Sequence, residues 1–463
     1  MTSSPFFDNL CTLPVTTDLF AQALHPTRPH VTIALASGHV ETYRLPAAEE
    51  NETDADSPQT EANPTNGTNS ILSTRRRSST ASLNGLGSID TIWRTRRHKG
   101  SCRTLSYSHD GTICYSAGTD GLVKAFDSET GKVRSKVALP SDRDGEMDAP
   151  SLLHALSPQT LLVATDSGAL HVYNLTQAGG QIASTPSATY HPHNNEHVAG
   201  LTVIPPSASS TSGFPKQWIT VGGSTLAVMD LYKGVVATSE DQEEELTSVM
   251  YISGLKKGGT SVGEKVLVGQ ADGVLSLWER GVWGDLDERI VVDRGGNAIE
   301  CLCAVSADFV PSGKLKTNER IIATGLEDGT IKFVRIGRNT VIQEWELKHE
   351  EIDGVVGLGF DAAGRMVSGG GQTVKVWATA KEAQPRSQSN GLGKHDREEG
   401  DEDEWEDEDN SDDDEVGVDG ESDDEMDSDE DDARRDRGKR KKRKRNRGKD
   451  KSGGKALSFS GLL

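Results

Sequence analysis

Apolar and polar residues alternate along much of the chain in short stretches that come in pairs. In each pair, a run rich in apolar residues is followed by a turn with glycine, and then by an alternating run that usually ends in an aromatic residue. A period of two is typical of strands that bury one face, and Asp-Gly or Ser-Gly turns favour hairpins. The pattern predicts seven β-hairpins, at residues 31–43, 113–126, 161–173, 219–229 (the weakest match), 266–278, 321–333 and 366–377.

A further apolar strand precedes several of these hairpins, as at residues 104–107, 246–250 and 355–360. Seven copies leave about 48 residues for each repeat, slightly more than the 40–45 of a WD repeat. Such repeats close into a ring, so the predicted fold is all-β: a seven-bladed WD-repeat β-propeller. Residues 9–15 are expected to complete the blade that ends near Trp377, since a closed ring protects its sheet edges.

Composition separates this ring from two polar segments. Residues 1–45 and 88–379 are expected to form the propeller. Residues 46–87 form an insert and residues 380–463 a tail, and both are predicted to be disordered because they hold too few apolar residues to offset chain entropy. The net charge of −22 is unevenly spread: in the tail, residues 396–432 hold 25 acids and one base and residues 434–451 hold 13 bases and two acids, while the other 408 residues carry a net charge of −9. The overall charge therefore says little about the folded part.

The sequence lacks the signatures of several protein classes. No apolar run approaches the roughly 20 residues that span a bilayer, and no secretory signal is visible. No phosphate-binding loop or nucleophile elbow occurs, and Cys301 and Cys303 are spaced too closely for a zinc pair. A transition-metal site at His191, His193 and His197 is not favoured, because these residues lie in a polar loop. We expect no enzyme activity, cofactor, metal, membrane contact or small-molecule substrate. The odd cysteine count suits free thiols in a reducing compartment, the five being Cys11, Cys102, Cys114, Cys301 and Cys303.

Acidic residues stand at or beside the turn glycines of several repeats, namely Asp120, Asp166, Asp272 and Asp328. They could be metal-binding or catalytic carboxylates, but aspartate commonly caps its own turn through local hydrogen bonds. We therefore expect them to be structural. His98 is expected to form a hydrogen bond with Asp120 of the same blade and to be buried, which is favoured over a role as a general base.

The tail carries the strongest functional signal, a run of seven bases: Lys439, Arg440, Lys441, Lys442, Arg443, Lys444 and Arg445. Such a run is typical of nuclear or nucleolar targeting, and it neutralises phosphates, which predicts RNA contact without sequence preference. The acidic block beside it could bind histones or basic ribosomal proteins, or mask the basic run. Serines next to acids or after arginines are candidate phosphosites: Ser78, Ser79, Ser411, Ser422 and Ser428.

Several stretches go beyond a generic propeller. They include Asp-Asn-Leu-Cys-Thr-Leu-Pro at 8–14, Arg-His-Lys-Gly-Ser-Cys-Arg-Thr-Leu at 97–105, and Ala-Gly-Thr-Asp-Gly at 117–121. With residues 19–26, 37–45 and 126–132, they resemble the WD repeat-containing protein 55 group, whose fungal members share the order of propeller, acidic stretch and basic C-terminus. The resemblance implies a nucleolar protein of ribosomal RNA processing and large-subunit assembly. The 46–87 insert departs from the group, and only the second blade approaches a full WD repeat.

Three functions are compatible with these features. The favoured one is a non-enzymatic scaffold that binds pre-ribosomal proteins through its propeller faces, in the nucleus and nucleolus. A substrate receptor of a cullin-type ubiquitin ligase is weaker, because Leu-Trp-Glu-Arg at 277–280 misses the Trp-Asp-x-Arg spacing. The third is a histone chaperone that acts through the acidic block.

Overall fold

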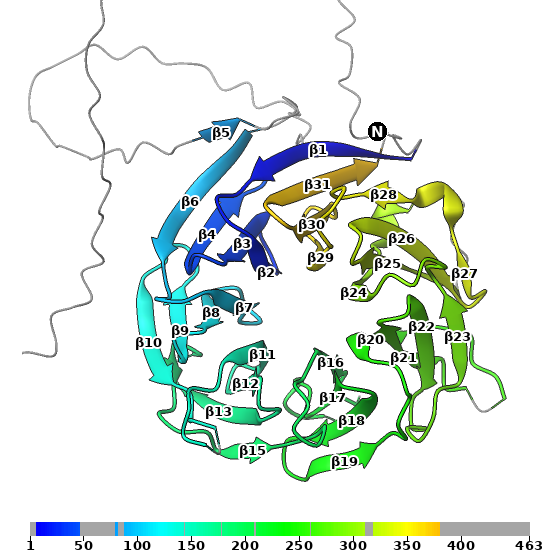
Figure 1. The fold of residues 1–463 in the computed structure, drawn as a ribbon, viewed down its shortest axis with the longest axis horizontal. Helices are drawn as coiled ribbons and strands as arrows, with labels where there is room; N and C mark the ends of the chain where they lie inside the picture. The colour runs from blue at the N-terminus through cyan, green and yellow to red at the C-terminus, as the bar shows by residue number, and fades with distance from the viewer. Residues whose placement is uncertain are drawn as a thin grey trace, which may run out of the picture. The chain divides into compact units, whose positions relative to one another are not determined.

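Seven antiparallel sheets stand around a central axis, as Figure 1 shows for the computed structural model. The structure describes residues 6–46, 79–81, 88–142, 144–176, 178–207, 210–259, 261–310 and 318–379. Within them, helix is confined to two short 3₁₀ turns, η1 (Ala307–Phe309) and η2 (Gln343–Trp345). The predicted all-β, seven-bladed β-propeller is confirmed.

We number the blades by their inner strands, which lie nearest the central axis (Figure 1). Blade 1 consists of β2 (Leu19–Leu24), β3 (His30–Leu35), β4 (His39–Arg44), β6 (Ser88–Arg96) and β5 (Ser79–Ala81). Blade 2 consists of β7 (Cys102–Tyr107), β8 (Ile113–Gly118), β9 (Leu122–Asp127) and β10 (Val133–Ala138). Blade 3 consists of β11 (Pro150–Ser157), β12 (Thr160–Thr165), β13 (Leu170–Thr176), β14 (Gln181–Ile182) and β15 (Ala188–Tyr190).

Blades 4 to 7 follow the same plan. Blade 4 consists of β16 (Gly200–Ile204), β17 (Gln217–Gly222), β18 (Thr225–Asp230) and β19 (Gly234–Thr238), and blade 5 of β20 (Leu246–Ser253), β21 (Glu264–Gln270), β22 (Val274–Glu279) and β23 (Glu288–Val291). Blade 6 consists of β24 (Ile299–Ala304), β25 (Arg320–Leu326), β26 (Thr330–Ile336), β27 (Thr340–Val341) and β28 (Leu347–Lys348). Blade 7 consists of β29 (Gly357–Phe360), β30 (Met366–Gly370), β31 (Thr373–Thr379) and β1 (Phe7–Pro14).

All seven predicted hairpins are present, and the weakest one forms the regular pair β17 and β18. Each hairpin joins the second and third strands of its blade. The upstream strands at 104–107 and 246–250 lie in β7 and β20, whereas the one expected at 355–360 begins later, at Gly357.

The ring closes through both ends of the described chain. Strand β1 pairs antiparallel with β31, with Phe7 opposite Thr379, Asn9 opposite Trp377 and Pro14 opposite Thr373. The predicted closure by the N-terminal segment is therefore confirmed, and blade 7 contains the first and last strands of the ring (Figure 1).

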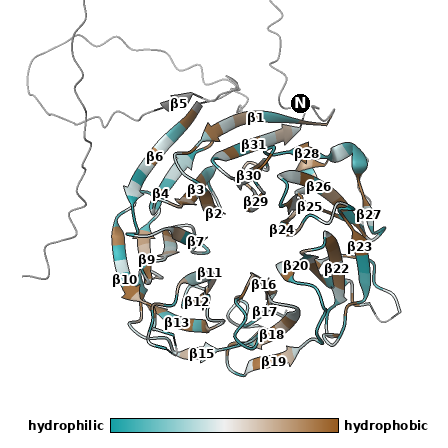
Figure 2. Cartoon of the chain, in the orientation of Figure 1, coloured by the Kyte–Doolittle hydropathy of each residue, from teal (hydrophilic) through white to brown (hydrophobic). Residues whose placement is uncertain are grey.

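Alternation along the strands builds apolar layers between neighbouring blades, and Figure 2 shows brown and teal positions following one another along them. Tyr115 and Val123 of blade 2 share one buried cluster with Leu161 and Tyr173 of blade 3. Because every blade packs on two neighbours, burial of apolar surface makes the ring one continuous body.

The hairpin turns pack against the loops that lead into the inner strands. Gly38, between β3 and β4, has φ +81°, and a Cβ placed there would lie 2.2 Å from the backbone oxygen of His98. Gly329 in blade 6 has φ +80°, and its Cβ would lie 2.4 Å from the backbone oxygen of Glu350. Glycine is required at these two turns both by the positive φ and by the close approach. We call this end of the ring the turn face.

Part of the predicted insert is described. Residues Ser79–Ala81 form β5, which pairs with β6 through Ser79 opposite Asp90. The rest of the insert beyond Pro46 and the whole of the tail from residue 380 lie outside the described residues, and with them the basic run 439–445, Ser78, Ser411, Ser422 and Ser428. No helix in the described ranges is long and apolar enough to cross a membrane.

Candidate interaction site at the channel mouth

The central channel opens at the turn face into a cavity of about 600 Å³. The first residue of an inner strand points into the apolar layer between blades, as Leu19 and Ile299 do. The second residue therefore faces the channel, because side chains alternate along a strand. Five blades place such a residue in the cavity wall: Phe20, Arg103, Ser151, Thr247 and Glu300.

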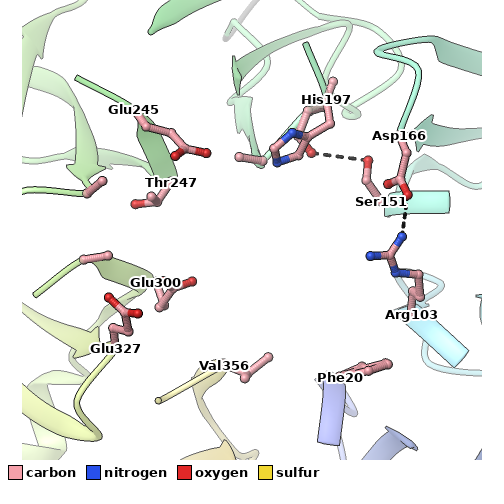
Figure 3. A pocket seen from close by; sticks show the side chains of 14 residues that line it. Phe20, Arg103, Ser151, Asp166, His197, Glu245, Thr247, Glu300, Glu327 and Val356 are labelled. Atoms are coloured by element: carbon pink, nitrogen blue, oxygen red, sulfur yellow. Dashed lines mark hydrogen bonds and ion pairs between the residues drawn. The ribbon is translucent and has the colours of Figure 1, made fainter. Parts of the chain in front are cut away.

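Three glutamates form one side of this cavity (Figure 3). Glu300 lies on β24, Glu245 directly precedes β20, and Glu327 directly follows β25. Burial, and then the nearby charges of Glu327 and Glu245, raise the pKa of Glu300 above its usual value. In the part of the chain that the structure describes, none of the three has an ion-pair partner within 4.0 Å, which leaves this side of the mouth acidic.

The opposite side combines an ion pair with apolar side chains. Arg103 Nη1 lies 2.6 Å from Asp166 Oδ2, with both side chains partly exposed. Phe20 of blade 1 and Val356, just before β29 of blade 7, are 42% and 43% exposed. Ser151 donates a hydrogen bond to the backbone oxygen of Val198 at 3.4 Å. The cavity thus has an acidic side and a side that is apolar and charge-balanced.

The predicted pair in blade 2 has hydrogen-bond geometry. His98 Nδ1 lies 2.8 Å from Asp120 Oδ1, and His98 Nε2 lies 2.8 Å from Ser116 Oγ. The backbone N–H of Lys99 donates to Asp120 Oδ2 at 3.1 Å. Burial lowers the pKa of His98, so its imidazole is neutral at pH 7. These contacts tie the entry loop of the blade to its hairpin turn.

The other turn aspartates divide into two kinds. Asp272 and Asp328 each accept a hydrogen bond from the backbone N–H two residues later, at 3.1 and 2.9 Å, and so cap their own turns. Asp166 differs from the expectation, because its carboxylate pairs with Arg103 across the blade boundary. Its turn is held by Asp148, which accepts a hydrogen bond from the backbone N–H of Ser167 at 3.1 Å. Asp166 therefore belongs to the channel mouth.

Sequence reasoning missed a second buried histidine network in blade 7. His349 is fully buried, with Nδ1 2.8 Å from Ser368 Oγ and Nε2 3.3 Å from the backbone oxygen of Gly370. Trp377 Nε1 donates to Ser368 Oγ at 2.8 Å. One sequence pattern could have revealed this network: the spacing between His349 and Ser368 nearly repeats the spacing between His98 and Ser116. The pattern was not recognised because the turn after Ser368 has no aspartate in the place of Asp120.

The histidines of the 191–197 loop do not act together. His193 is buried, with Nδ1 2.8 Å from Thr225 Oγ1 and Nε2 2.9 Å from Thr220 Oγ1, and burial lowers its pKa to about 4. His191 is exposed, and His197 lines the channel mouth. Among the described residues, no three His, Cys, Asp or Glu side chains are arranged so that they could hold a metal ion.

The closed ring and the His98 network define a WD-repeat β-propeller, and the family model "WD domain, G-beta repeat" matches residues 90–127. Proteins of this class generally serve as non-enzymatic scaffolds that bind other proteins. The chain is 53% identical over 380 residues to the WD repeat-containing protein jip5 of Neosartorya fischeri, covering 81% of this chain and 85% of that protein.

Two further relatives agree. The chain is 54% identical over 377 residues to the jip5 protein of Aspergillus clavatus, covering 81% of this chain and 84% of that one. It is 51% identical over 377 residues to the JIP5 protein of Phaeosphaeria nodorum, covering 80% and 82%. The chain belongs to the family of WD repeat-containing protein jip5.

Proposed function

We propose that this protein is a non-enzymatic scaffold of ribosome biogenesis, which supports ribosomal RNA processing and large-subunit assembly in the nucleolus. The observation that carries the proposal is the combination of a closed propeller with seven consecutive bases at 439–445. The ring offers rigid faces for pre-ribosomal proteins, while the basic run suits nuclear import and phosphate contact without sequence preference. The resemblance to the WD repeat-containing protein 55 group supplies the nucleolar process.

The chemistry of the channel mouth supports a binding role. Nucleophilic catalysis needs a nucleophile within hydrogen-bond reach of a base. At the mouth, Ser151 is bonded to a backbone oxygen, and Arg103 and Asp166 neutralise each other. Thr247, beside the three glutamates, donates its hydroxyl to the backbone oxygens of Gly269 and Ile299, at 3.1 and 2.7 Å. This arrangement favours recognition of a partner over turnover of a substrate.

Nucleolar targeting is tested by replacing the bases at 439–445 with glutamine in the full chain, tagged with a fluorescent protein. We expect the signal to leave the nucleolus. Replacement of Arg75, Arg76 and Arg77 with glutamine serves as a matched control, because it removes bases from the other polar segment. A 439–445 variant that still concentrates in nucleoli would contradict the targeting role.

Participation in pre-ribosomes is tested by purifying the tagged full-length protein from nuclear extract with and without RNase. We expect large-subunit proteins and assembly factors to co-purify. Those that persist after RNase are bound through protein contacts, and those that are lost are bound through RNA. Recovery of neither ribosomal proteins nor assembly factors would refute the proposed function.

A further inference from the structure

The channel mouth brings together side chains from all parts of the ring. Glu245, Glu300 and Glu327 come from blades 5 and 6, and Phe20 and Val356 come from blades 1 and 7 on another part of the wall (Figure 3). The cavity of about 600 Å³ falls within the range of sites that hold a ligand or a set of partner side chains. Its two sides differ in chemistry, which restricts what can fill it.

The acidic side lacks a cation of its own. Arg103 and His197 are the basic residues among those that line the cavity; the charge of Arg103 is balanced by Asp166 at 2.6 Å, and no ion pair within 4.0 Å joins His197 to the three glutamates. The carboxylates of Glu245, Glu300 and Glu327 therefore face the cavity with their charges uncompensated. Glu300 is exposed to solvent at the mouth, yet partial desolvation and then the like charges of Glu327 and Glu245 raise its pKa, so its charged form carries a modest free-energy cost. A cation in the cavity would lower that cost.

The apolar side presents large hydrophobic side chains to solvent. Phe20 and Val356 are 42% and 43% exposed at the mouth. On the same turn face, Met147 lies over the hairpin turn at Gly121 and Ile352 lies in the loop before β29, and they are 60% and 87% exposed. Of these four side chains, Phe20 and Val356 lie in the cavity wall itself, where exposed apolar surface favours contact with a protein partner. The stem of a lysine or arginine packs on such surface while its head meets the acids, and a cation can also lie over the face of Phe20.

We propose that the channel mouth binds a lysine- or arginine-containing segment of a partner protein, with the cationic head against Glu245, Glu300 and Glu327. The proposal rests on the scaffold function and names the chemistry of its partner. Charge complementarity decides between macromolecules: an uncompensated acidic side repels the phosphates of a nucleic acid and attracts a basic polypeptide. The basic partner and any RNA held by the tail thus use different parts of the chain.

The test uses purified full-length protein and a fluorescein-labelled peptide in which arginine alternates with glycine and leucine, with binding followed by fluorescence anisotropy. The triple variant Glu245→Gln, Glu300→Gln, Glu327→Gln keeps the shape of the cavity and removes its charge. We expect it to weaken peptide binding about tenfold, as for the loss of three partly exposed ion pairs. The matched control is Asp412→Asn, Asp413→Asn, Asp414→Asn, which removes the same charge from the tail and should change binding less than about twofold.

A second variant tests the cavity by its shape. Ala199→Trp fills the mouth without changing its charge and should also weaken peptide binding. A peptide that carries a photoreactive phenylalanine should cross-link to the turn face in the unmodified protein. Equal binding by the unmodified protein and the triple variant, or cross-links found only in the tail, would overturn the proposal.

A single-stranded RNA of mixed sequence separates the two classes of partner. We expect the triple variant and Ala199→Trp to bind this RNA no more weakly than the unmodified protein does. Loss of RNA binding in both variants would show that the mouth is an RNA site, and would overturn the proposal. The outcomes stay separate from the proposed function: a protein that concentrates in nucleoli with its pre-ribosomal partners while the triple variant still binds the peptide refutes only this inference.

Discussion

Besides its pairing with β31, the closing strand β1 inserts the aromatic side chain of Phe7 between blades 6 and 7. Its ring centroid lies 4.7 Å from that of Phe309 and 5.4 Å from that of Phe333, both stacked, and 5.4 Å from Trp345 in an edge-on contact. Phe7 is only 2% exposed. The replacement Phe7→Ala would therefore leave a cavity at the joint that closes the ring.

The expected cost follows from these contacts. Truncation of a buried phenylalanine to alanine costs about 3–5 kcal/mol, and each aromatic neighbour adds about 0.5–1.5 kcal/mol to what apolar burial alone provides. Because Phe7 has three aromatic neighbours, we expect Phe7→Ala to lower the free energy of unfolding by about 5 kcal/mol, the upper end of this range. For a ring of this size, that corresponds to a melting temperature lower by about 10 °C.

Thermal and urea unfolding of the full chain, followed by circular dichroism, measure this loss. Phe20→Ala is the matched control, because it makes the same change at a side chain that is 42% exposed, and it should cost only about 1 kcal/mol. If Phe7→Ala and Phe20→Ala shift the midpoint equally, Phe7 does not hold the closure together.

Two further predictions concern the turn face and the buried histidines. Gly38→Ala should cost about 2 kcal/mol more than Gly145→Ala, because both glycines have positive φ, +81° and +83°, but only the Cβ at Gly38 meets backbone atoms. The urea concentration at the midpoint of unfolding measures the stability lost by each variant. Equal losses would mean that the close approach of Gly38 to the backbone of the next blade is unimportant. Burial lowers the pKa of His349 to about 4, so the unfolded state takes up a proton between about pH 6.5 and 4 that the folded state does not. The free energy of unfolding should fall as the pH falls through this range, by up to about 3 kcal/mol from this residue. The His349→Gln variant should lose that part of the pH dependence. If the difference in unfolding free energy between the two proteins stays constant with pH, the imidazole of His349 is not buried in its neutral form.

Local patterning determines most of the fold. The hairpins and the closing segment were predictable because alternation and turn glycines act over a few residues, and each blade repeats them. The His98 and Asp120 contact was predictable for the same reason, since both residues lie in one repeat. His349 escaped prediction because its bonds go to a serine, a threonine and a backbone oxygen, without the aspartate that marks the pattern.

The channel mouth could not be derived from the sequence. Glu245, Glu300 and Glu327 each lie at or next to the end of a different strand, and nothing in the neighbouring sequence distinguishes them from other surface glutamates. Only the closed ring brings them to one side of a cavity, opposite a phenylalanine from the first blade. The pairing of Asp166 with Arg103 was missed for the same reason, because it joins two blades.

The closure also imposes an order on how the protein is made. Strand β1 is synthesised before the other strands of the ring, whereas its partner β31 is synthesised after them. At ordinary rates of translation this delay is on the order of tens of seconds. Throughout it, Phe7, Cys11 and Leu13, which are buried in the finished ring, lack the strand that covers them. Until translation passes the last blade, the nascent chain therefore exposes an apolar strand that is prone to aggregate.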